Sequence, residues 1–416
     1  MQTKEFYEAL FQFGADWRVS KVETDHSKLE VEVYLEYALP QGRSPSTGDL
    51  LPFYDHRPER RWRHLDTMQY KTFLHARIPR IREANGDIVS ISVPWSDAHS
   101  HHSWLFESWA IQLLEATRNQ TQTSALLRIS YDQLHLIMER AVERGLMARE
   151  REFEQELPDG KGAITTLAID EKSYRVGPRF LTIVSDHACG RVLEIAEGRS
   201  EEAAISAMQS ALPPKALKKI VAVSMDMAPG FRQAVEKLLP HAEIVHDKFH
   251  LFQYLSNAID QTRRAEVIDV PLLRNARFAM LKNEKKRTEK QRQTFHIIDE
   301  LNLKTAQAWR VRENFKGMYE TCATVSEAIA YYALWKGRAL ATAITPVRHV
   351  VETFDRHVAG IVMFFKHKIT SALAERLNGK IQTLKVIGRG YRNVENLRIA
   401  ILFFYGKLDL LPHRTL

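Results

Sequence analysis

Two short apolar runs in this chain each end in an aspartate. They read Ile164-Thr-Thr-Leu-Ala-Ile-Asp170 and Ile220-Val-Ala-Val-Ser-Met-Asp226. Short runs of apolar and β-branched residues are typical of buried strands. From residue 163 onward the spacing predicts the order strand, strand, strand, helix, strand, helix, strand, helix, with Asp170 on the first strand and Asp226 at the end of the fourth. We therefore expect an α/β sheet in this part of the chain.

A third acidic residue, Glu375, lies in the helical stretch Ser371-Ala-Leu-Ala-Glu-Arg-Leu-Asn-Gly379. In the RNase H-like fold the first and fourth strands are neighbours, so Asp170 and Asp226 would face one another and Glu375 would complete the set. Mg²⁺ prefers oxygen ligands, and a cation offsets the repulsion between carboxylates. Two such ions support phosphoryl transfer, one by activating a water or a 3′-hydroxyl and the other by stabilising the leaving oxygen.

Simpler explanations exist for each of these acidic residues. An aspartate at a strand end is often a turn residue or a helix cap. Taken alone, Glu375 is no stronger a signal than any exposed glutamate on a helix. Glu313 and Glu352 are competing candidates for the third ligand. The prediction therefore depends on the pair of aspartates in this element order.

The composition restricts the class of protein. The chain has 416 residues, a net charge of +8 and two cysteines, Cys189 and Cys322. The length predicts two to four domains, and the charge favours a polyanionic partner, most simply nucleic acid. Two cysteines rule out a disulfide framework and an all-cysteine zinc site, and they fit a reducing, cytoplasmic setting. The first residues lack a signal-peptide pattern, and no apolar run approaches the roughly 20 residues that span a bilayer.

The first 150 residues predict two regions. Residues 1–103 read as strands and loops, with strands at 29–35 and 70–78 and a hairpin turn at Asn85-Gly86. Residues 104–150 have helical spacing, with helices at 104–117, 124–129 and 131–144, a cap at Ser130 and a stop at Gly145. Two short helices joined by a tight turn resemble a helix-turn-helix, and an ordinary three-helix packing unit remains the alternative.

Later boundaries follow from changes in pattern. Residues 151–162 read as a linker, 163–264 as the first part of the α/β core, 265–345 as a basic, all-helical insertion, and 346–416 as the C-terminal part that carries Glu375. The fold class that we expect is therefore multidomain α+β.

Basic and aromatic side chains indicate where DNA would be contacted. Phosphate contacts supply affinity and base contacts supply specificity. A first group surrounds Trp62 and consists of Arg57, Arg60, Arg61, Arg63 and Lys71. A second group, Tyr131, Gln133 and His135, begins the last helix of the helix-turn-helix, where a recognition helix meets bases. A third group follows Glu375 and is either a DNA track or a solvated helix face: Lys380, Lys385, Arg389 and Arg392.

Several segments in this order resemble one known family. They include Tyr54-Asp-His-Arg-Pro-Glu-Arg-Arg-Trp-Arg-His-Leu-Asp66, Ala168-Ile-Asp-Glu-Lys-Ser173, Met225-Asp-Met-Ala-Pro-Gly-Phe231, Asp247-Lys-Phe-His-Leu-Phe252 and Glu375-Arg-Leu-Asn-Gly-Lys-Ile381, with residues 93–95, 126–130, 137–145 and 390–393. Over nearly its whole length the chain is similar to a bacterial insertion-sequence transposase of the ISL-three family, with an RNase H-like DDE catalytic core.

The resemblance implies a set of site residues. Asp170, Asp226 and Glu375 would be the catalytic, metal-binding triad for Mg²⁺ or Mn²⁺, with two ions in each active site. Asp247 and His250 form an Asp-x-x-His element that would support the metal ligands or the scissile phosphate, and Asn378 would support Glu375. A helix-start aspartate and a packed histidine are the structural alternative for Asp247 and His250.

One departure from the family concerns zinc. The family usually carries an N-terminal zinc ribbon with Cys-x-x-Cys pairs, but Ser44-Pro-Ser-Thr-Gly48 and Ile81-Arg-Glu-Ala-Asn85 occupy the expected places here. We therefore expect no zinc and a subdomain that is held by its aromatic core. The histidines His99, His101 and His102 are expected in a solvated loop rather than in a replacement metal site.

The resemblance implies a transposase that binds terminal inverted repeats as a homodimer or larger synaptic oligomer. It would cleave phosphodiester bonds and transfer the 3′-hydroxyl ends to double-stranded target DNA, in the bacterial cytoplasm or on the nucleoid, without a membrane. Two alternatives remain at this stage: a non-catalytic DNA-binding regulator derived from a transposase, and an RNase H-like nuclease that never joins strands.

Overall fold

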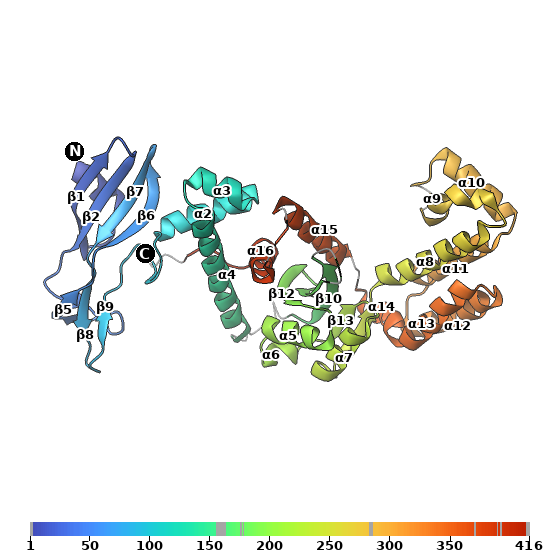
Figure 1. Ribbon diagram of the computed structural model, residues 1–416. Helices are drawn as coiled ribbons and strands as arrows, with labels where there is room; N and C mark the ends of the chain where they lie inside the picture. The colour runs from blue at the N-terminus through green and yellow to red at the C-terminus, as the bar shows by residue number, and fades with distance from the viewer. Residues whose placement is uncertain are drawn as a thin grey trace. The chain divides into compact units, whose positions relative to one another are not determined.

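The computed structural model describes residues 3–154, 164–174, 177, 179–282, 286–369, 372–388, 390–391 and 393–412 (Figure 1). The chain divides into two compact units. Unit 1 is Met1–Arg149 with Leu408–Leu416, and unit 2 is Glu150–Lys407. Among the helices of the described ranges, none is long and apolar enough to cross a membrane.

In its described residues, unit 1 begins with a helix that the sequence did not predict, and three sheets follow. Helix α1 (Thr3–Phe11) precedes a four-stranded sheet in the order β1 (Trp17–Asp25), β2 (Glu30–Tyr37), β7 (Tyr70–Ala76), β6 (Arg60–Thr67). Strands β2 and β7 are parallel, and the other pairs are antiparallel. A three-stranded sheet contains β5 (Phe53–His56), β8 (Pro79–Arg82) and β9 (Ile88–Ser90), and β3 (Gly42–Arg43) pairs with β4 (Leu50–Leu51). The predicted strands near residues 30 and 70 and the Asn85-Gly86 hairpin are confirmed.

The core of the N-terminal sheets is aromatic. The ring of Trp95 lies 4.9 Å from that of Trp17 and 5.5 Å from that of Trp62, and the Trp62 side chain is fully buried. Burying rings of this size supplies much of a small core. The expectation that Trp62 faces DNA is therefore wrong, because its side chain belongs to the interior.

Helices α2, α3 and α4 follow in unit 1, and three of their six predicted ends are wrong. Helix α2 (Trp104–Thr117) has the predicted bounds, whereas α3 (Gln120–Leu127) begins earlier than residue 124 because Asn119 caps it. Helix α4 (Tyr131–Glu154) runs through Gly145 and through the first residues of the expected linker, whose residues 155–163 lie outside the described ranges. Gly145 serves packing, since a Cβ there would lie 2.6 Å from the Cβ of Leu408.

Unit 2 contains a five-stranded sheet in the order β12 (Arg191–Glu197), β11 (Phe180–Asp186), β10 (Thr166–Ser173), β13 (Ala222–Met225), β14 (Glu243–His246). β10, β11 and β12 form an antiparallel meander, whereas β13 runs parallel to β10 and β14 runs parallel to β13. Helices α5 (Glu201–Ala211), α6 (Pro214–Leu217), α7 (Pro229–Leu238) and α8 (Lys248–Glu266) connect and follow these strands. The predicted element order is confirmed, but β10 continues to Ser173 instead of ending at Asp170.

The rest of unit 2 is helical in the described residues. η1 (Pro271–Asn275), α9 (Arg277–Leu281), α10 (Glu289–Glu300), α11 (Lys304–Thr321), α12 (Val325–Ala341) and α13 (Thr345–Val362) share one hydrophobic core with α8. Pro346 does not break a helix but stands in the first turn of α13, where a missing N–H costs little. α14 (Phe364–His367), α15 (Ala372–Ile387) and α16 (Val394–Tyr405) follow. Arg398 of α16 donates to Glu194 of β12 at 2.7 Å.

Candidate active site

The pairing of β10 with β13 brings the two aspartates to one place in the sheet. The strands are parallel, with Ala168 opposite Ser224. Two residues further along each strand lead to Asp170 and Asp226. Because parallel neighbours run in the same direction, the two carboxylates lie at the same level of the sheet. The predicted neighbourhood of the two aspartates is confirmed.

Asp226 links the end of β13 to helix α7. Its Oδ1 accepts the backbone N–H of Ala228 at 2.8 Å, and its backbone carbonyl lies 3.1 Å from Nδ1 of His246. Burial raises the pKa of the Asp226 carboxyl, and the negative charge of Asp170 adds to this rise. The side chain is therefore a turn residue and, at the same time, a carboxylate that a nearby cation would stabilise.

His250 supplies a positive charge beside these carboxylates. It lies on the first turn of α8, and its Nε2 is 3.8 Å from Oδ1 of Asp170 and 3.8 Å from Oδ2 of Asp247. Asp247 caps the helix, accepting the N–H of Phe249 at 2.8 Å. The carboxylate of Asp170 is the main cause that raises the pKa of His250 to about 9, so the imidazole is charged at neutral pH. Both structural and electrostatic roles are thus combined in this Asp-x-x-His element.

Helix α15 is tied to β10 by polar side chains. Asn378 Nδ2 donates to Oδ2 of Asp170, and Lys385 Nζ donates to the carbonyl of Ser173 at 2.8 Å. Glu375 precedes Asn378 by three residues and so shares its helix face. Glu375 is exposed, and the described part of the chain contains no group of three His, Cys, Asp or Glu side chains placed to hold a metal ion. The structure therefore brings Asp170, Asp226, His250 and Asn378 together but does not gather Glu375 into a common ligand cluster.

Two further charged residues adjoin the site, and the sequence prediction missed both. Glu171 follows Asp170 on β10, and burial together with the charge of Asp226 raises the pKa of its carboxyl. Arg199 lies 3.7 Å from Oε2 of Glu171 and also acts on Asp226. The adjacent acidic pair in the sequence was a signal for Glu171. For Arg199 there was no local signal, because it follows β12 and reaches the site only through the fold.

The donor set fits a hard divalent cation. The available atoms are carboxylate oxygens of Asp170 and Asp226, and Mg²⁺ and Mn²⁺ favour such ligands. Burial is the main cause of the raised pKa of Asp226, and a bound cation would stabilise the ionised form of this carboxyl.

The predicted basic patch of β6 is largely engaged within unit 1. Arg63 is buried, with guanidinium contacts to Asp66, to the carbonyl of His64 at 2.5 Å and to the carbonyl of Thr72 at 3.3 Å. The expectation that Arg63 contacts DNA is therefore wrong, because its charge is satisfied inside the protein. Arg61 is exposed but pairs with Glu32 at 2.5 Å. Lys71 lies 4.0 Å from Glu30.

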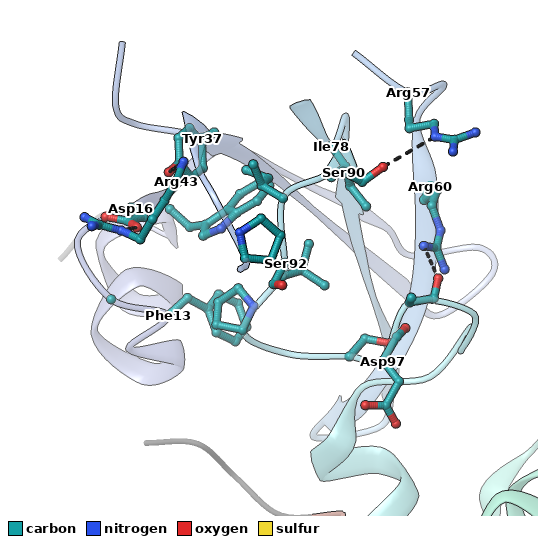
Figure 2. Close-up of a pocket in the computed structure, with 18 of the residues that line it drawn as sticks. Phe13, Asp16, Tyr37, Arg43, Arg57, Arg60, Ile78, Ser90, Ser92 and Asp97 are labelled. Atoms are coloured by element: carbon teal, nitrogen blue, oxygen red, sulfur yellow. Dashed lines mark hydrogen bonds and ion pairs between the residues drawn. The ribbon is translucent and has the colours of Figure 1, made fainter. Parts of the chain in front are cut away.

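A cavity of about 1400 Å³ opens beside the remaining arginines of this patch. Figure 2 shows Arg57 and Arg60 along one side of it and the pair Arg43 and Asp16 on the opposite side. Arg60 donates to the carbonyls of Ala98 at 2.6 Å and Ser100 at 2.9 Å, which leaves Arg57 as the more exposed cation.

The histidine segment beside the cavity differs from the expected solvated loop. His99 and His101 are exposed and line the cavity, but His102 is buried and stacks on Phe106 with 5.3 Å between ring centroids. Burial lowers the pKa of His102 to about 4. The prediction of a solvated loop is wrong for His102.

The predicted DNA-contacting residues of the helix-turn-helix differ in exposure and in hydrogen bonding. Tyr131 is exposed and stacks parallel to His135, with 6.4 Å between the rings. Gln133 forms a capping box with Ser130, since each side chain accepts the backbone N–H of the other at 3.1 Å and 3.0 Å. Arg128, in the turn before α4, donates to Gln69 and Asp66 and fixes this turn to the β6–β7 hairpin.

The last basic group is only partly described. Lys380 is exposed, and its carbonyl accepts the hydroxyl of Tyr405 at 3.0 Å. Lys385 is engaged with Ser173, and burial lowers its pKa. Arg389 and Arg392 lie outside the described residues.

Three family models match this chain. The DDE model of family ISL3, described as a transposase, matches residues 167–401, more than half of the chain. The helix-turn-helix domain of transposase family ISL3 matches residues 91–142, which confirms the predicted motif. The zinc-finger of the transposases of IS204, IS1001, IS1096 and IS1165 matches residues 48–82.

Curated relatives agree with these matches. The transposase for insertion sequence element IS1557 of Mycobacterium tuberculosis is 25% identical over 385 residues, covering 85% of this chain and 84% of the relative. The transposase for insertion sequence element IS1001 of Bordetella parapertussis is 29% identical over 251 residues, or 57% of this chain and 60% of the relative. The chain belongs to the ISL3 family and is a DNA transposase.

Proposed function

We propose that unit 2 contains an RNase H-like DDE core that cleaves transposon ends and transfers the 3′-hydroxyl groups to target DNA. The observation that carries this proposal is the parallel pairing of β10 with β13, which places Asp170 and Asp226 side by side and next to His250. Strand order and element order support the RNase H-like assignment, with residues 265–345 as a helical insertion before the C-terminal part of the core.

Asp170, Asp226 and Glu375 would hold Mg²⁺ or Mn²⁺, with two ions as the expected number. Bound divalent ions supply an activated oxygen nucleophile and offset the charge of the leaving oxygen. The bond of Asn378 to Asp170 supports this role for Glu375, because the two residues lie three positions apart on α15. Side-chain rotation at the exposed Glu375 would bring its carboxylate to the aspartates when a cation is present.

His250 and Asn378 would hold the ligands in position. Asn378 donates to Oδ2 of Asp170, and the backbone N–H of Glu171 donates to Oδ1 at 2.8 Å, so these two donors would orient the carboxylate toward a cation. The imidazolium of His250, oriented between Asp170 and Asp247, limits the repulsion between carboxylates and offers a positive group to the scissile phosphate. Asp247 in turn holds α8 at its first residue, so it fixes the place from which His250 extends.

Unit 1 would bind the terminal inverted repeats. Tyr131 and His135 are the side chains of the α4 start that are best placed to meet bases, because Gln133 is occupied by the capping box. Arg57 would contact phosphates at the edge of the cavity, with Arg60 shaping the neighbouring loop. In unit 2, Lys380 together with Lys385, Arg389 and Arg392 would follow the DNA near the active site.

Transposition joins two ends, so we propose a homodimer or larger synaptic complex that assembles on double-stranded DNA at the nucleoid. Residues 1–103 and 104–150 would act as the two end-binding domains. Residues 163–264 and 346–407 would together form the catalytic core, and the expected boundary at residue 416 is corrected because Leu408–Leu416 belongs to unit 1.

The test is a strand-cleavage and joining assay on end DNA with Mn²⁺, comparing the wild type with Asp226→Asn. We expect the substitution to abolish both reactions and to leave unfolding and end binding unchanged. Asp269→Asn, at an exposed position of the same unit, is the matched control and should remain active. Activity that survives Asp226→Asn would refute the metal-ligand assignment, and cleavage without joining in the wild type would show a nuclease instead.

A further inference from the structure

Two tight turns face each other in the region that resembles a zinc finger. The first joins β3 to β4, where the N–H of Ser44 donates to the carbonyl of Asp49 at 2.8 Å and that of Gly48 donates to the carbonyl of Ser44 at 2.9 Å. The second joins β8 to β9, where the N–H of Glu83 donates to the carbonyl of Asp87 at 2.9 Å. From the family resemblance, these two turns are the places where cysteine pairs were expected and are missing. The structure brings the two turns together.

Three side chains connect the two turns. The hydroxyls of Ser44 and Ser46 both donate to Oε1 of Glu83, each at 2.6 Å. Ser44 is 3% exposed, and its Oγ also accepts the N–H groups of Ser46 at 3.3 Å and Thr47 at 3.2 Å. The two hydroxyls lower the pKa of Glu83, so the carboxylate is ionised at neutral pH. An anion therefore stands at the point where the turns meet.

This donor set does not fit a zinc ion. Structural zinc sites use four ligands from cysteine, histidine or carboxylate side chains, whereas the side chains that join the turns are two neutral hydroxyls and the carboxylate of Glu83. Both cysteines of the chain, Cys189 and Cys322, belong to unit 2. Ser44, Ser46 and Glu83 flank residues 48–82, which match a zinc-finger model, and the side chains at both ends of this segment do not fit zinc.

We infer that the Ser44–Ser46–Glu83 cluster closes this zinc-finger region without a metal ion. In a zinc site the metal cation binds anionic ligands from two turns. Here the carboxylate of Glu83, on the β8–β9 turn, accepts the hydroxyls of Ser44 and Ser46 from the β3–β4 turn. Backbone packing supports the same closure, because a Cβ on Gly42 would lie 2.4 Å from Cγ2 of Ile81. The end-binding unit of this transposase accordingly stays folded in cells or buffers that are depleted of zinc.

The test combines metal analysis with thermal unfolding of the full chain in the presence of Mg²⁺. Five of the seven tryptophans, Trp17, Trp62, Trp95, Trp104 and Trp109, lie in unit 1, so intrinsic fluorescence reports mainly on this unit. We expect far less than one zinc ion per chain and no change in the unfolding midpoint with a zinc-selective chelator. Glu83→Gln and the double variant Ser44→Ala with Ser46→Ala should each lower the midpoint by about 5 °C, and added zinc should not restore it.

Glu36→Gln is the matched control, since Glu36 is half-exposed and pairs with Arg18 at the surface of the same unit at 2.6 Å. Its midpoint should stay close to that of the wild type. One zinc ion per chain, removed by the chelator together with folding, would overturn the inference. A midpoint shift in Glu83→Gln no larger than that in Glu36→Gln would overturn it as well.

Discussion

The buried carboxylate of Glu107 gives the sharpest prediction about the end-binding unit. It lies on α2 with 0% exposure and accepts hydrogen bonds from Arg140 at 2.6 Å, Arg144 at 3.1 Å and the hydroxyl of Ser100 at 2.8 Å. Arg144 also donates to the carbonyl of Leu410 at 2.7 Å. One carboxylate thus joins α2, α4 and the loop before α2, while its partner Arg144 holds the C-terminal segment.

Replacing Glu107 by Gln keeps the size of the side chain and removes its charge. Breaking a buried ion pair by removing one partner costs about 3–5 kcal/mol, because the other charge is left uncompensated. Arg140 and Arg144 are 26% and 19% exposed, so water compensates them in part and the lower end applies. We expect a loss of about 3 kcal/mol, which corresponds to a fall of about 6–12 °C in the unfolding midpoint of a unit of this size.

The measurement is urea and thermal unfolding of the full chain, followed by tryptophan fluorescence. Glu139→Gln, at an exposed position of α4, is the control and should change the free energy of unfolding by less than about 0.5 kcal/mol. If Glu107→Gln unfolds with the same free energy as Glu139→Gln, the reasoning that this carboxylate holds the helices together is refuted. A loss of end binding that is regained at low temperature would agree with it.

Three more predictions concern single positions. Gly360→Ala would place a Cβ 2.5 Å from the ring of His246, so we expect the free energy of unfolding to fall by about 1–3 kcal/mol and DNA cleavage to slow. Gly337→Ala has open space around it and should raise the free energy of unfolding by about 0.5–1 kcal/mol. Equal effects of the two substitutions would contradict this reasoning. Asn378→Ala removes the amide that donates to Oδ2 of Asp170, so we expect cleavage to slow about 10–100-fold while the unfolding midpoint stays unchanged. Full cleavage activity would count against a positioning role for Asn378. Burial lowers the pKa of His102 from 6.5 to about 4, so between these pH values the unfolded chain binds a proton that the folded chain does not. The free energy of unfolding should be complete above pH 6.5 and fall by at most about 3 kcal/mol as the pH drops to 4. A His102→Gln variant with the same pH dependence would disprove this role.

The α/β core was predictable because its strands are short apolar runs with clear turns between them. Leu167 and Ile169 of β10 and Val223 of β13 are buried in one cluster, as their apolar character required. Asp226 accepts a backbone N–H in the turn before α7, as the simpler explanation predicts, and it also lies beside Asp170, as the expected strand order predicts. Local pattern and strand order were sufficient for this part of the site.

The predictions were wrong where packing in the folded chain determines the surroundings of a residue. Arg63 lies in a basic run that reads as a surface patch, but Asp66 and the backbone carbonyls satisfy its charge in the interior. Gly145 reads as a helix stop, although it is the close approach of Leu408 that excludes a larger side chain. Neither partner is evident from the periodicity around these positions.

The choice of the third carboxylate shows what the structure adds to the sequence. Glu313 and Glu352 competed with Glu375, but their described contacts are with Arg312 and Arg348 of their own helices, at 2.9 Å and 3.8 Å. Glu375 lies instead on the helix that is bonded to β10 through Asn378 and Lys385. Since residues three positions apart share a helix face, Glu375 belongs to the same face of α15 as Asn378, and on this ground we propose Glu375 as the third ligand.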